Sequence, residues 1–451
     1  MPKNKRRTAS FLVVLAVSFV LMTSCATATD ADAGPVKVPE VPANACLIDS
    51  KLVLGQINPL VYGVNHGPWA VITEKTAPLA EESAITMIRF PGGNWGDENN
   101  LRPYHIDQFV SLAEQIGAEV SINVRLFGGS PELAADLVRY ANLEKGYGIQ
   151  YWGIGNEPTL YAAAHAAPEY GVAQFNEEWR AIAQAMRAVD GSIMLIGPEL
   201  HQFGSTLEST PKDPFGLDWM TEFLKVNGDL VDFVSIHRYP FPQTFVGGTA
   251  TVDELMAASQ EWDQIIPYLR DLIQETTGNT LPIAVTEVNS HWSNAMGGEA
   301  TPDSFINAIW WADVLGRMMT NHVAVVNYFS LQSNSSIGGY GLFGRSEPRP
   351  TYYVYKLYQE FGENLVFSGC GIPELRIYAA RDEEGRLTVI FINMSEESIS
   401  SPLTLEGGDY DLISAHRLDQ QNLYHALMLE NFKDLDALSF PAYSITHLKF
   451  E

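Results

Sequence analysis

Residues 149–158 read Ile-Gln-Tyr-Trp-Gly-Ile-Gly-Asn-Glu-Pro, a short apolar run that ends in an amide, a carboxylate and a proline. Aromatic and β-branched residues bounded by glycine and proline are typical of a buried strand. Similar runs recur along the chain with amphipathic segments between them, which predicts parallel strands joined by helices. The predicted strands are residues 60–65, 85–90, 119–124, 149–155, 193–197, 231–237, 283–287 and 323–329. Eight such units predict an α/β fold of the (β/α)8 TIM-barrel type.

The predicted helices have recognisable first residues. Ser130 and Thr301 each precede a proline, which fits a helix N-cap followed by proline at the first helical position. Thr251 and Glu254 have the spacing of a capping box. We therefore expect helices to begin at these three points.

The chain of 451 residues is longer than the roughly 250 residues that one barrel needs. Residues 58–362 are predicted to form the barrel, and residues 363–451 a smaller antiparallel β-sandwich, because strands there follow one another without helices. Residues 45–57 have no partner in the barrel, so they are predicted to supply an N-terminal strand to the sandwich. The strands expected in the sandwich are residues 375–380, 387–393, 400–405 and 444–450.

The first residues have the features of an export signal. Four basic residues precede an apolar run at residues 11–22, and Thr23-Ser24-Cys25 follows. The run is shorter than the roughly 20 residues that cross a bilayer. We expect residues 1–24 to be a lipoprotein signal peptide, Cys25 to be the lipid attachment site and residues 25–44 to be a flexible tether. The alternative is a plain signal peptide, which would give a secreted protein.

Charge and cysteine content narrow the class of protein. The formal charge of −26 becomes −30 without residues 1–24, which hold four basic residues and no acidic one. Nucleic acid is therefore excluded as a partner. In an exported protein, Cys46 and Cys370 form either a disulfide or two buried free thiols. We keep both alternatives open.

The chemistry of a TIM barrel lies at the carboxyl ends of its strands. Glu157 follows the fourth predicted strand and Glu287 ends the seventh, so the two side chains should face each other across the barrel mouth. Hydrolysis of a glycosidic bond needs one carboxyl to protonate the leaving oxygen and a second to attack the anomeric carbon. Glu157 and Glu287 are the candidates for these two roles. The alternative is that each is a solvated loop residue.

Three phrases carry a family resemblance: Arg-Phe-Pro-Gly-Gly-Asn at residues 89–94, Tyr-Ala-Asn at 140–142, and Tyr-Trp-Gly-Ile-Gly-Asn-Glu at 151–157. The barrel resembles the retaining glycoside hydrolases of clan A. It looks most like the arabinofuranosidase branch, family 51, and the appended sandwich is also like families 39, 30 and 44. The resemblance implies hydrolysis of a glycan without a cofactor.

The resemblance also implies that Glu157 is the acid/base and Glu287 the nucleophile. We then expect the charge of Glu287 to raise the pKa of Glu157. Neighbouring residues are given roles by the same resemblance. Asn156 would bind the sugar hydroxyl next to the anomeric carbon, and Arg89 would lie near Glu287. Tyr239 or His237 would orient Glu287 by a hydrogen bond. The alternatives are a structural ion pair for Arg89 and a core histidine for His237.

Aromatic residues follow several strands and suit the flat C–H faces of sugars. Trp95 and Trp292 are candidate platforms, Asn94 is a candidate polar contact, and each could instead be a packing or supporting residue. The chain contains no HExxH and no cluster of cysteine and histidine, so the sequence predicts no metal.

These observations predict a retaining glycosidase acting outside the cytoplasm on a neutral plant-type or microbial oligosaccharide or polysaccharide, with arabinofuranosides as the first guess. One alternative is an endo-glucanase, xylosidase or glucuronidase of the same clan. If the substrate is a glucuronide, Arg125, Arg238 and Arg345 near strand ends are the candidates to bind its carboxylate. The other is a glycan-binding lipoprotein without catalysis.

A substitution tests the anchor. Cys25→Ala removes the sulfur that would carry the lipid, so we expect the protein to leave the membrane fraction and appear in the soluble fraction. Ser24→Ala keeps a small residue before the cysteine and should stay membrane-bound. Fractionation followed by immunoblotting measures both variants. A Cys25→Ala protein as firmly bound as the wild type would show that the anchor assignment is wrong.

Overall fold

A computed structural model describes residues 38–241, 250–293, 295–333 and 339–451. The expected signal peptide, Cys25 and most of the expected tether lie outside the described residues. No helix within these ranges is long and apolar enough to cross a membrane. Residues 40–451 form one unit, and the rest of the description concerns that unit.

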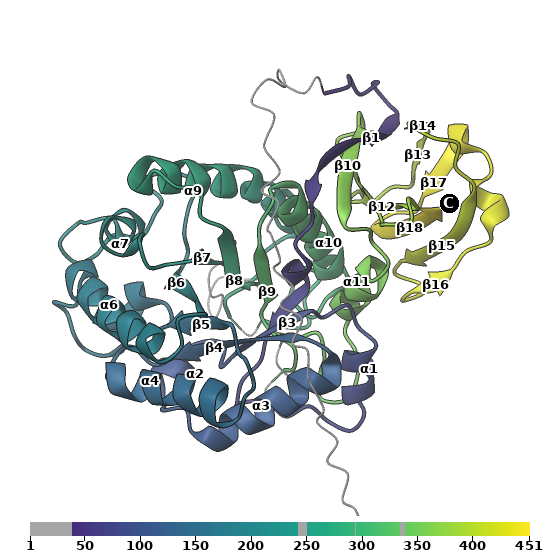
Figure 1. Cartoon of the computed structure of the whole chain (residues 1–451). Coiled ribbons are helices and arrows are strands. Elements are labelled where there is room, and N and C mark those ends of the chain that lie inside the picture. The colour runs from purple at the N-terminus through teal and green to yellow at the C-terminus, as the bar shows by residue number, and fades with distance from the viewer. Residues whose placement is uncertain (1–37, 242–249, 294, 334–338) are drawn as a thin grey trace, which may run out of the picture. The chain divides into compact units, whose positions relative to one another are not determined.

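Eight parallel strands form a closed barrel, in which each strand pairs with the next and the last pairs with the first (Figure 1). The barrel strands are β2 (Gly63–Asn65), β3 (Met87–Phe90), β4 (Glu119–Val124), β5 (Tyr151–Ile154), β6 (Met194–Leu200), β7 (Phe233–Arg238), β8 (Ile283–Val288) and β9 (Val325–Tyr328). The predicted (β/α)8 fold class is confirmed.

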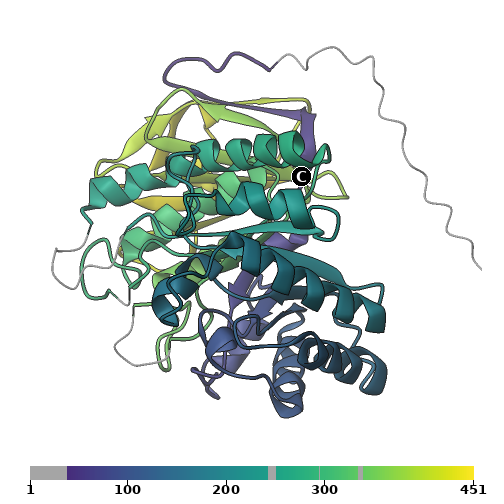
Figure 2. The ribbon, with the colours of Figure 1, turned by 90° about the vertical axis from the view of Figure 1, so that its left-hand side faces the viewer.

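Helices follow the barrel strands and cover their outer side (Figure 2). The helices are α1 (Ala77–Glu81), α2 (Trp95–Glu98), α3 (Pro103–Ile116), α4 (Pro131–Val138), α5 (Tyr161–Ala164), α6 (Val172–Val189), α7 (Trp219–Asn227), α8 (Val252–Ala258), α9 (Trp262–Thr277), α10 (Phe305–Thr320) and α11 (Pro350–Tyr358). The N-caps predicted at Ser130 and Thr251 are confirmed, because each side chain accepts a hydrogen bond from the first turn. The one predicted at Thr301 is wrong, since Ser304 caps α10 instead.

All barrel strands except β4 differ by a few residues from their predicted bounds, and the largest shifts at one end are in the first and fifth strands. Residues 59–62 form a 3-10 helix, whose first turn is capped by Asn58, so the first strand begins only at Gly63. The fifth strand, β6, continues past its predicted end at Gly197 to Leu200. The added residues include Glu199, which the site description below takes up.

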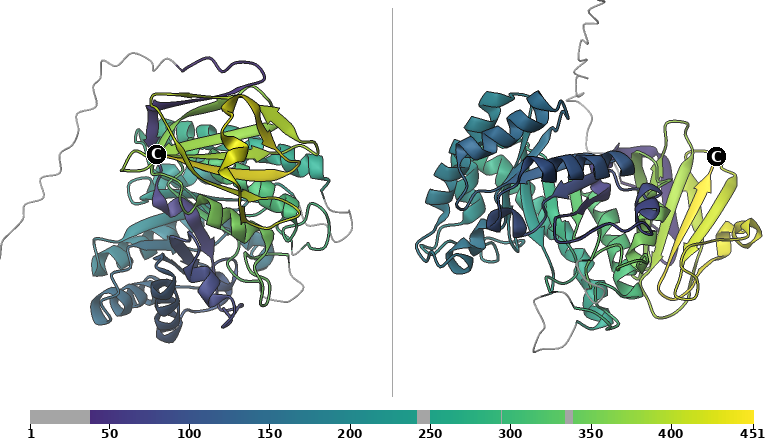
Figure 3. Two further views of the ribbon diagram at one scale, coloured as in Figure 1. Left: turned by 90° about the vertical axis from the view of Figure 1, so that its right-hand side faces the viewer. Right: turned by 90° about the horizontal axis from the view of Figure 1, so that it is seen from below.

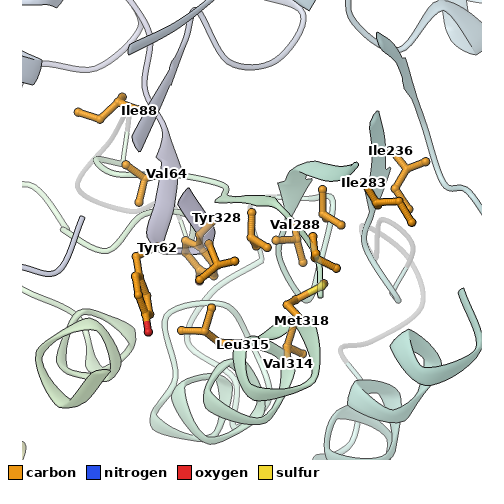
Figure 4. Close-up of a cluster of buried hydrophobic side chains, with 14 of the residues drawn as sticks. Tyr62, Val64, Ile88, Ile236, Ile283, Val288, Val314, Leu315, Met318 and Tyr328 are labelled. Atoms are coloured by element: carbon orange, nitrogen blue, oxygen red, sulfur yellow. The ribbon is translucent and has the colours of Figure 1, made fainter. Parts of the chain in front are cut away.

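The barrel core lies between the strands and helices such as α10. Val314, Leu315 and Met318 of α10 point toward Val288 and Tyr328 of the barrel strands (Figure 4). All five side chains are fully buried, and burial of one such side chain contributes about 1.5–3 kcal/mol. α10 is buried around almost its whole circumference, as expected of a helix with packing on two sides.

The C-terminal residues form a mostly antiparallel, curled sheet of eight strands with a two-stranded sheet beside it (Figure 3). The strands are β1 (Cys46–Gln56), β10 (Asn364–Cys370), β11 (Leu375–Arg381), β12 (Leu387–Asn393), β13 (Ile399–Ser401), β14 (Leu403–Glu406), β15 (Leu412–Leu418), β16 (His425–Ala426), β17 (Leu438–Phe440) and β18 (Ser444–Phe450). The strand expected at residues 400–405 is two strands, because Pro402 separates β13 from β14. The pairing of β1 with β14 is parallel.

The segment before the barrel and the segment after it are neighbouring strands. β1 pairs antiparallel with β10, and Cys46 lies opposite Cys370 in that register. The two cysteines form a disulfide, which resolves the two alternatives left open by the sequence. At the other end of the pair, the backbone N–H of Ile57 donates to the carbonyl of Glu363 at 2.8 Å.

A buried carboxylate joins α10 to the C-terminal sheet. Asp313 accepts hydrogen bonds from Tyr378 Oη on β11 at 2.6 Å, from Arg317 Nε at 2.8 Å and from Ser259 Oγ at 2.6 Å. Gly316, one turn along the helix, leaves room for the Tyr378 ring, because an added Cβ would lie 2.3 Å from it. These contacts anchor the sheet on the barrel.

The disulfide gives a stability prediction. In a Cys25→Ser background, which leaves two cysteines, thiol labelling of the unfolded and unreduced protein should modify neither Cys46 nor Cys370. The Cys46→Ala/Cys370→Ala double variant should be about 2–4 kcal/mol less stable to urea, because the cross-link closes a long loop in the unfolded chain. Reduction should remove this difference. Two labelled thiols in the unreduced protein would contradict the bridge.

Candidate active site

The two predicted catalytic glutamates lie together and are both buried. Glu287 is in β8 with 3% of its surface exposed, and Glu157 follows β5 with 7% exposed. One oxygen of each carboxylate and one ring nitrogen of His237 lie within 4.8 Å of one another. A retaining site holds its two carboxyl groups roughly 5–5.5 Å apart, so this spacing fits retention and leaves little room for the water that inversion needs.

The backbone turns sharply to place Glu157. Its φ of 48° and ψ of 53° lie in the left-handed region, which costs a residue with a side chain about 1–2 kcal/mol. Gly155, with φ of 77°, makes the same turn without that cost. The backbone N–H of Glu157 donates to the carbonyl of Glu199 at 3.1 Å. Such strained positions persist where surrounding contacts fix them, and they cluster at functional sites.

Glu287 accepts hydrogen bonds at both of its oxygens. Arg89 Nη1 and the backbone N–H of Gly93 each donate to Oε1 at 2.8 Å, and Tyr239 Oη donates to Oε2 at 2.8 Å. These contacts fix the orientation of the carboxylate. Of the two candidates predicted to orient Glu287, Tyr239 is the one that binds it. His237 is not, because its Nδ1 is 3.7 Å away and binds Glu157.

The two glycines of the Gly-Gly-Asn phrase, Gly92 and Gly93, are needed for backbone conformation and close packing. Gly93 has φ of 67°, and this conformation turns its N–H toward Glu287. Gly92 lies against Asn65, whose Oδ1 would be 2.6 Å from an added Cβ. The same Oδ1 accepts a hydrogen bond from Arg89 Nη1 at 2.8 Å. The two glycines therefore allow β2, β3 and the nucleophile to meet closely.

Asn156 belongs to the same polar network. Its Oδ1 accepts from Arg89 Nη2 at 2.8 Å, and its Nδ2 donates to Asn94 Oδ1 at 2.9 Å. Its backbone N–H donates to the buried carboxylate of Asp97 at 2.7 Å. The amide is thus held beside Glu157 with a fixed orientation. The predicted contact of Asn156 with a sugar hydroxyl stays a prediction.

Two histidines bind the same oxygen of Glu157. His201 Nδ1 lies 2.9 Å and His237 Nδ1 lies 3.0 Å from Oε1. Burial raises the pKa of Glu157, but the hydrogen bonds from His201 and His237 outweigh it and hold that pKa below its usual range. The expected rise in the pKa of Glu157 is therefore wrong for the free site, because the sequence analysis expected His237 to bind Glu287 and did not consider His201.

His237 shows the complementary shift. Burial lowers the pKa of His237, but the carboxylates of Glu287, Glu157 and Glu199 outweigh burial and raise it to about 9. The two shifts describe one proton that lies between His237 and Glu157 and titrates as a property of the pair.

Three residues of the site escaped the sequence analysis: Asn65, Glu199 and His201. Glu199 and His201 lie beyond Gly197, where the fifth strand was expected to end, so they were not examined as strand-end residues. Asn65 ends the first strand but was considered only as part of a strand. A systematic examination of the polar residues at every strand end would have found all three.

Aromatic side chains surround the nucleophile side of the site. Trp69, Asn94, Trp95, Phe329 and Tyr340 line one pocket, together with Gly93, whose N–H binds Glu287. The rings of Trp69 and Phe329 stack with their centroids 6.1 Å apart. Asn94 and Trp95 are thus placed where the sequence analysis expected substrate contacts.

Trp292 lies near Glu157 instead. Its side chain is 40% exposed, and its ring centroid is 5.6 Å from that of His201, which binds Glu157. An exposed aromatic ring beside the acid/base suits a platform for the leaving part of a substrate. The two predicted tryptophans therefore lie near different catalytic carboxylates.

The carboxylate cluster can be tested for a metal. Glu157, His237 and Glu287 are the one group of three or more histidine, cysteine or acidic residues, among those the structure describes, whose donor atoms could reach one ion. Arg89 already donates to Glu287, and both ring nitrogens of His237 face carboxylates. A ring that donates at both nitrogens has no lone pair for a metal. The arrangement fits a bound proton rather than a metal ion.

Comparisons with known proteins agree with this geometry. The chain is 27% identical over 253 residues to "Intracellular exo-alpha-(1->5)-L-arabinofuranosidase 1" of Bacillus subtilis (strain 168), a match that covers 43% of this chain and 48% of that protein. It is 28% identical over 444 residues to "Exo-alpha-(1->6)-L-arabinofuranosidase" of Bifidobacterium longum, covering 78% of this chain and 80% of that protein. The chain thus spans about half the length of the Bacillus relative.

Solved structures share the fold over almost the whole chain. The α-L-arabinofuranosidase from Thermotoga maritima, in complex with arabinose, has a TM-score of 0.69 at 18% identity and covers 90% of this chain and 99% of that one. CelM2, a bifunctional glucanase-xylanase from a metagenome library, has a TM-score of 0.70 at 17% identity and covers 91% and 99%. The family model described as "Glycosyl hydrolases family 39" matches residues 140–369, about half of the chain, including Glu157 and Glu287. The resemblance to clan A is confirmed, and the chain belongs to glycosyl hydrolase family 39.

Proposed function

We propose that the protein is a retaining glycoside hydrolase in which Glu157 is the acid/base and Glu287 the nucleophile. The observation that carries the proposal is the pair of buried carboxylates with oxygens within 4.8 Å and different surroundings. Glu287 is held by donors that do not give up a proton readily: a guanidinium, a backbone N–H and a tyrosine. Glu157 is held by two histidine rings, whose nitrogens can donate or accept a proton.

This difference in surroundings assigns the roles. In the first step, an oxygen of Glu287 attacks the anomeric carbon while Glu157 gives its proton to the leaving oxygen. In the second step, Glu157 takes a proton from water, which attacks the same carbon and releases Glu287. A binding protein without catalysis would need aromatic and amide groups, but it would have no use for a nucleophile and a proton donor held at this distance.

The substrate proposed first is a neutral glycan with terminal arabinofuranosyl groups. The names of the two relatives given above support this choice, as does the acidic charge of the chain. Two of the three arginines that could bind a uronic acid have protein partners. Arg238 Nη2 donates to Glu261 at 2.6 Å, and Arg125 Nε donates to the carbonyl of Phe127 at 2.8 Å.

The proposal places the enzyme outside the cytoplasm, as a lipoprotein attached through Cys25 or as a secreted protein. The basic start, the apolar run at residues 11–22 and the cysteine after Ser24 support export. The disulfide is consistent with an oxidising compartment.

The stereochemical course tests the mechanism. Proton NMR of the first-formed product should show the same anomer as the substrate. Glu157→Ala removes the proton donor, so substrates with poor leaving groups should lose the most activity. Added azide should restore turnover and give a glycosyl azide of retained configuration. In Glu287→Ala, which lacks the covalent route, azide should give at best the inverted product.

A matched control uses Glu119, an exposed glutamate at the opposite end of barrel strand β4. Glu119→Ala should keep wild-type kcat and be unaffected by azide. Inversion by the wild type, or an inverted azide product from Glu157→Ala together with a retained one from Glu287→Ala, would show that the roles are assigned wrongly.

A panel of nitrophenyl glycosides tests the substrate. We expect the highest kcat/KM for the α-L-arabinofuranoside, above the xyloside and the glucoside, because the two relatives named above are arabinofuranosidases. The glucuronide should also rank below it, because its charge is repelled by an acidic protein. A clear preference for the glucuronide would overturn the neutral-glycan proposal. It would point to Arg345 or a rearranged Arg125 as the clamp.

A further inference from the structure

A third carboxylate lies behind the two catalytic ones and takes no part in the steps described so far. Glu199, on β6, is fully buried. Its Oε2 lies 2.8 Å from His237 Nε2 and 3.5 Å from Arg89 Nη2, and it accepts the hydroxyl of Thr286. Its Oε1 accepts from Asn123 Nδ2 at 3.4 Å. A buried carboxylate is costly unless it is paired, so this one calls for an explanation.

We infer that Glu199 is a positioning residue that holds His237 as a doubly protonated ring, so that His237 keeps the acid proton within reach of Glu157. The inference deepens the proposed function and rests on the assignment of Glu157 as acid/base. Glu199 itself does not touch the substrate in this scheme, because His237 stands between it and Glu157.

The geometry around His237 supports the charged ring. The side chain is fully buried, and each ring nitrogen faces a carboxylate: Nε2 faces Glu199 at 2.8 Å and Nδ1 faces Glu157 at 3.0 Å. A neutral imidazole has one N–H, so one of these carboxylates would meet a lone pair. While both carboxylates are ionised, the ring satisfies both partners only as an imidazolium.

The other charged and titratable groups near His237 lie on several elements. Glu287 on β8 is 3.7 Å from Nδ1 and favours the charged ring. Arg89 on β3 opposes it, but its guanidinium is shared between Glu287 and Glu199. His201 meets the pair through Glu157. The phenols of Tyr239 and Tyr340 are subject to the charges of the same carboxylates. Burial and these charges raise the pKa of each phenol far above neutral pH.

The proton transfer balances within the pair formed by His237 and Glu157. An imidazolium beside a carboxylate and a neutral imidazole beside a carboxylic acid hold the same number of protons. Transfer breaks the Nδ1–H bond of His237 and forms an O–H bond on Glu157, across 3.0 Å. The leaving oxygen then takes that proton from Glu157. In the second step, Glu157 takes a proton from the attacking water, and the pair returns to its starting state.

The sign of the effect of Glu199 does not depend on where the shared proton sits. A nearby negative charge favours the protonated pair, and this agrees with the pKa of about 9 for His237. Removal of that charge must lower the pKa of the pair. The basic limb of kcat/KM reports the loss of this proton, so the limb should move to lower pH when Glu199 is neutralised.

The test is Glu199→Gln, assayed from pH 4 to 10 with the best aryl glycoside of the panel. We expect the basic limb to fall by at least about one pH unit, which lowers kcat/KM about tenfold on that limb while the acid limb stays in place. Glu199→Asp keeps the charge and should keep the limb close to that of the wild type. Asp313→Asn neutralises another buried, paired carboxylate far from the catalytic chemistry. It should lower stability but leave both limbs unchanged.

A second measurement covers the case in which Glu199→Gln does not fold. The nitrogen chemical shifts of His237 in the wild type, assigned by comparison with His237→Asn, should show both ring nitrogens protonated at pH 7. A neutral His237 at pH 7, or a basic limb of Glu199→Gln that coincides with that of the wild type, would overturn the inference. The azide experiments would then still support or reject the role of Glu157, so the two failures are distinguishable.

Discussion

The buried guanidinium of Arg89 is the interaction on which the site depends. It donates to Glu287, Asn65 and Asn156, and Glu199 lies within 3.5 Å of it. A fully buried cation without partners is strongly destabilising, and loss of one partner of a buried pair costs about 3–5 kcal/mol. The groups around Arg89 are therefore fixed by folding itself, and the same contacts orient the nucleophile. The candidate active site is therefore formed by the groups that balance the buried charge of Arg89.

The sequence predicts much of this fold because local pattern and tertiary structure agree in the barrel. Glu157 and Glu287 could be identified because each ends a buried strand, where a charged residue has few structural reasons to be. Glu199 follows a predicted strand in the same way, but its position beside His237 could not be predicted, because the register of β6 against β7 shifts between Gly197 and Leu200 and such an irregularity depends on the neighbouring strand. The sequence analysis also missed β10, which pairs with the distant β1, and β17, which pairs with β13. It missed β15 and β16 as well, although these two strands pair with each other as near neighbours.

His237 illustrates how a residue can be identified while its partner is not. The sequence placed His237 and Tyr239 on one face of a strand, and either could reach Glu287. In the structure, Tyr239 donates a hydrogen bond to Glu287, whereas His237 lies between Glu157 and Glu199. The choice depends on a carboxylate on the adjacent strand. Strand-end positions can thus indicate which residues meet at a barrel mouth, whereas pairing among them needs the register of every strand.

The pairing of β1 with β10 joins the segment before the barrel to the segment after it. These strands are antiparallel neighbours, so the barrel, from Ile57 to Glu363, is topologically one very long loop inserted into a β-hairpin. The ends of that loop meet at a single backbone hydrogen bond, and the disulfide closes the far end of the hairpin. The sheet is therefore not an appendage that a truncation after the barrel could remove cleanly, because its loss would leave β1 as an unpaired edge. Barrel and sheet therefore have to be expressed together, as one piece.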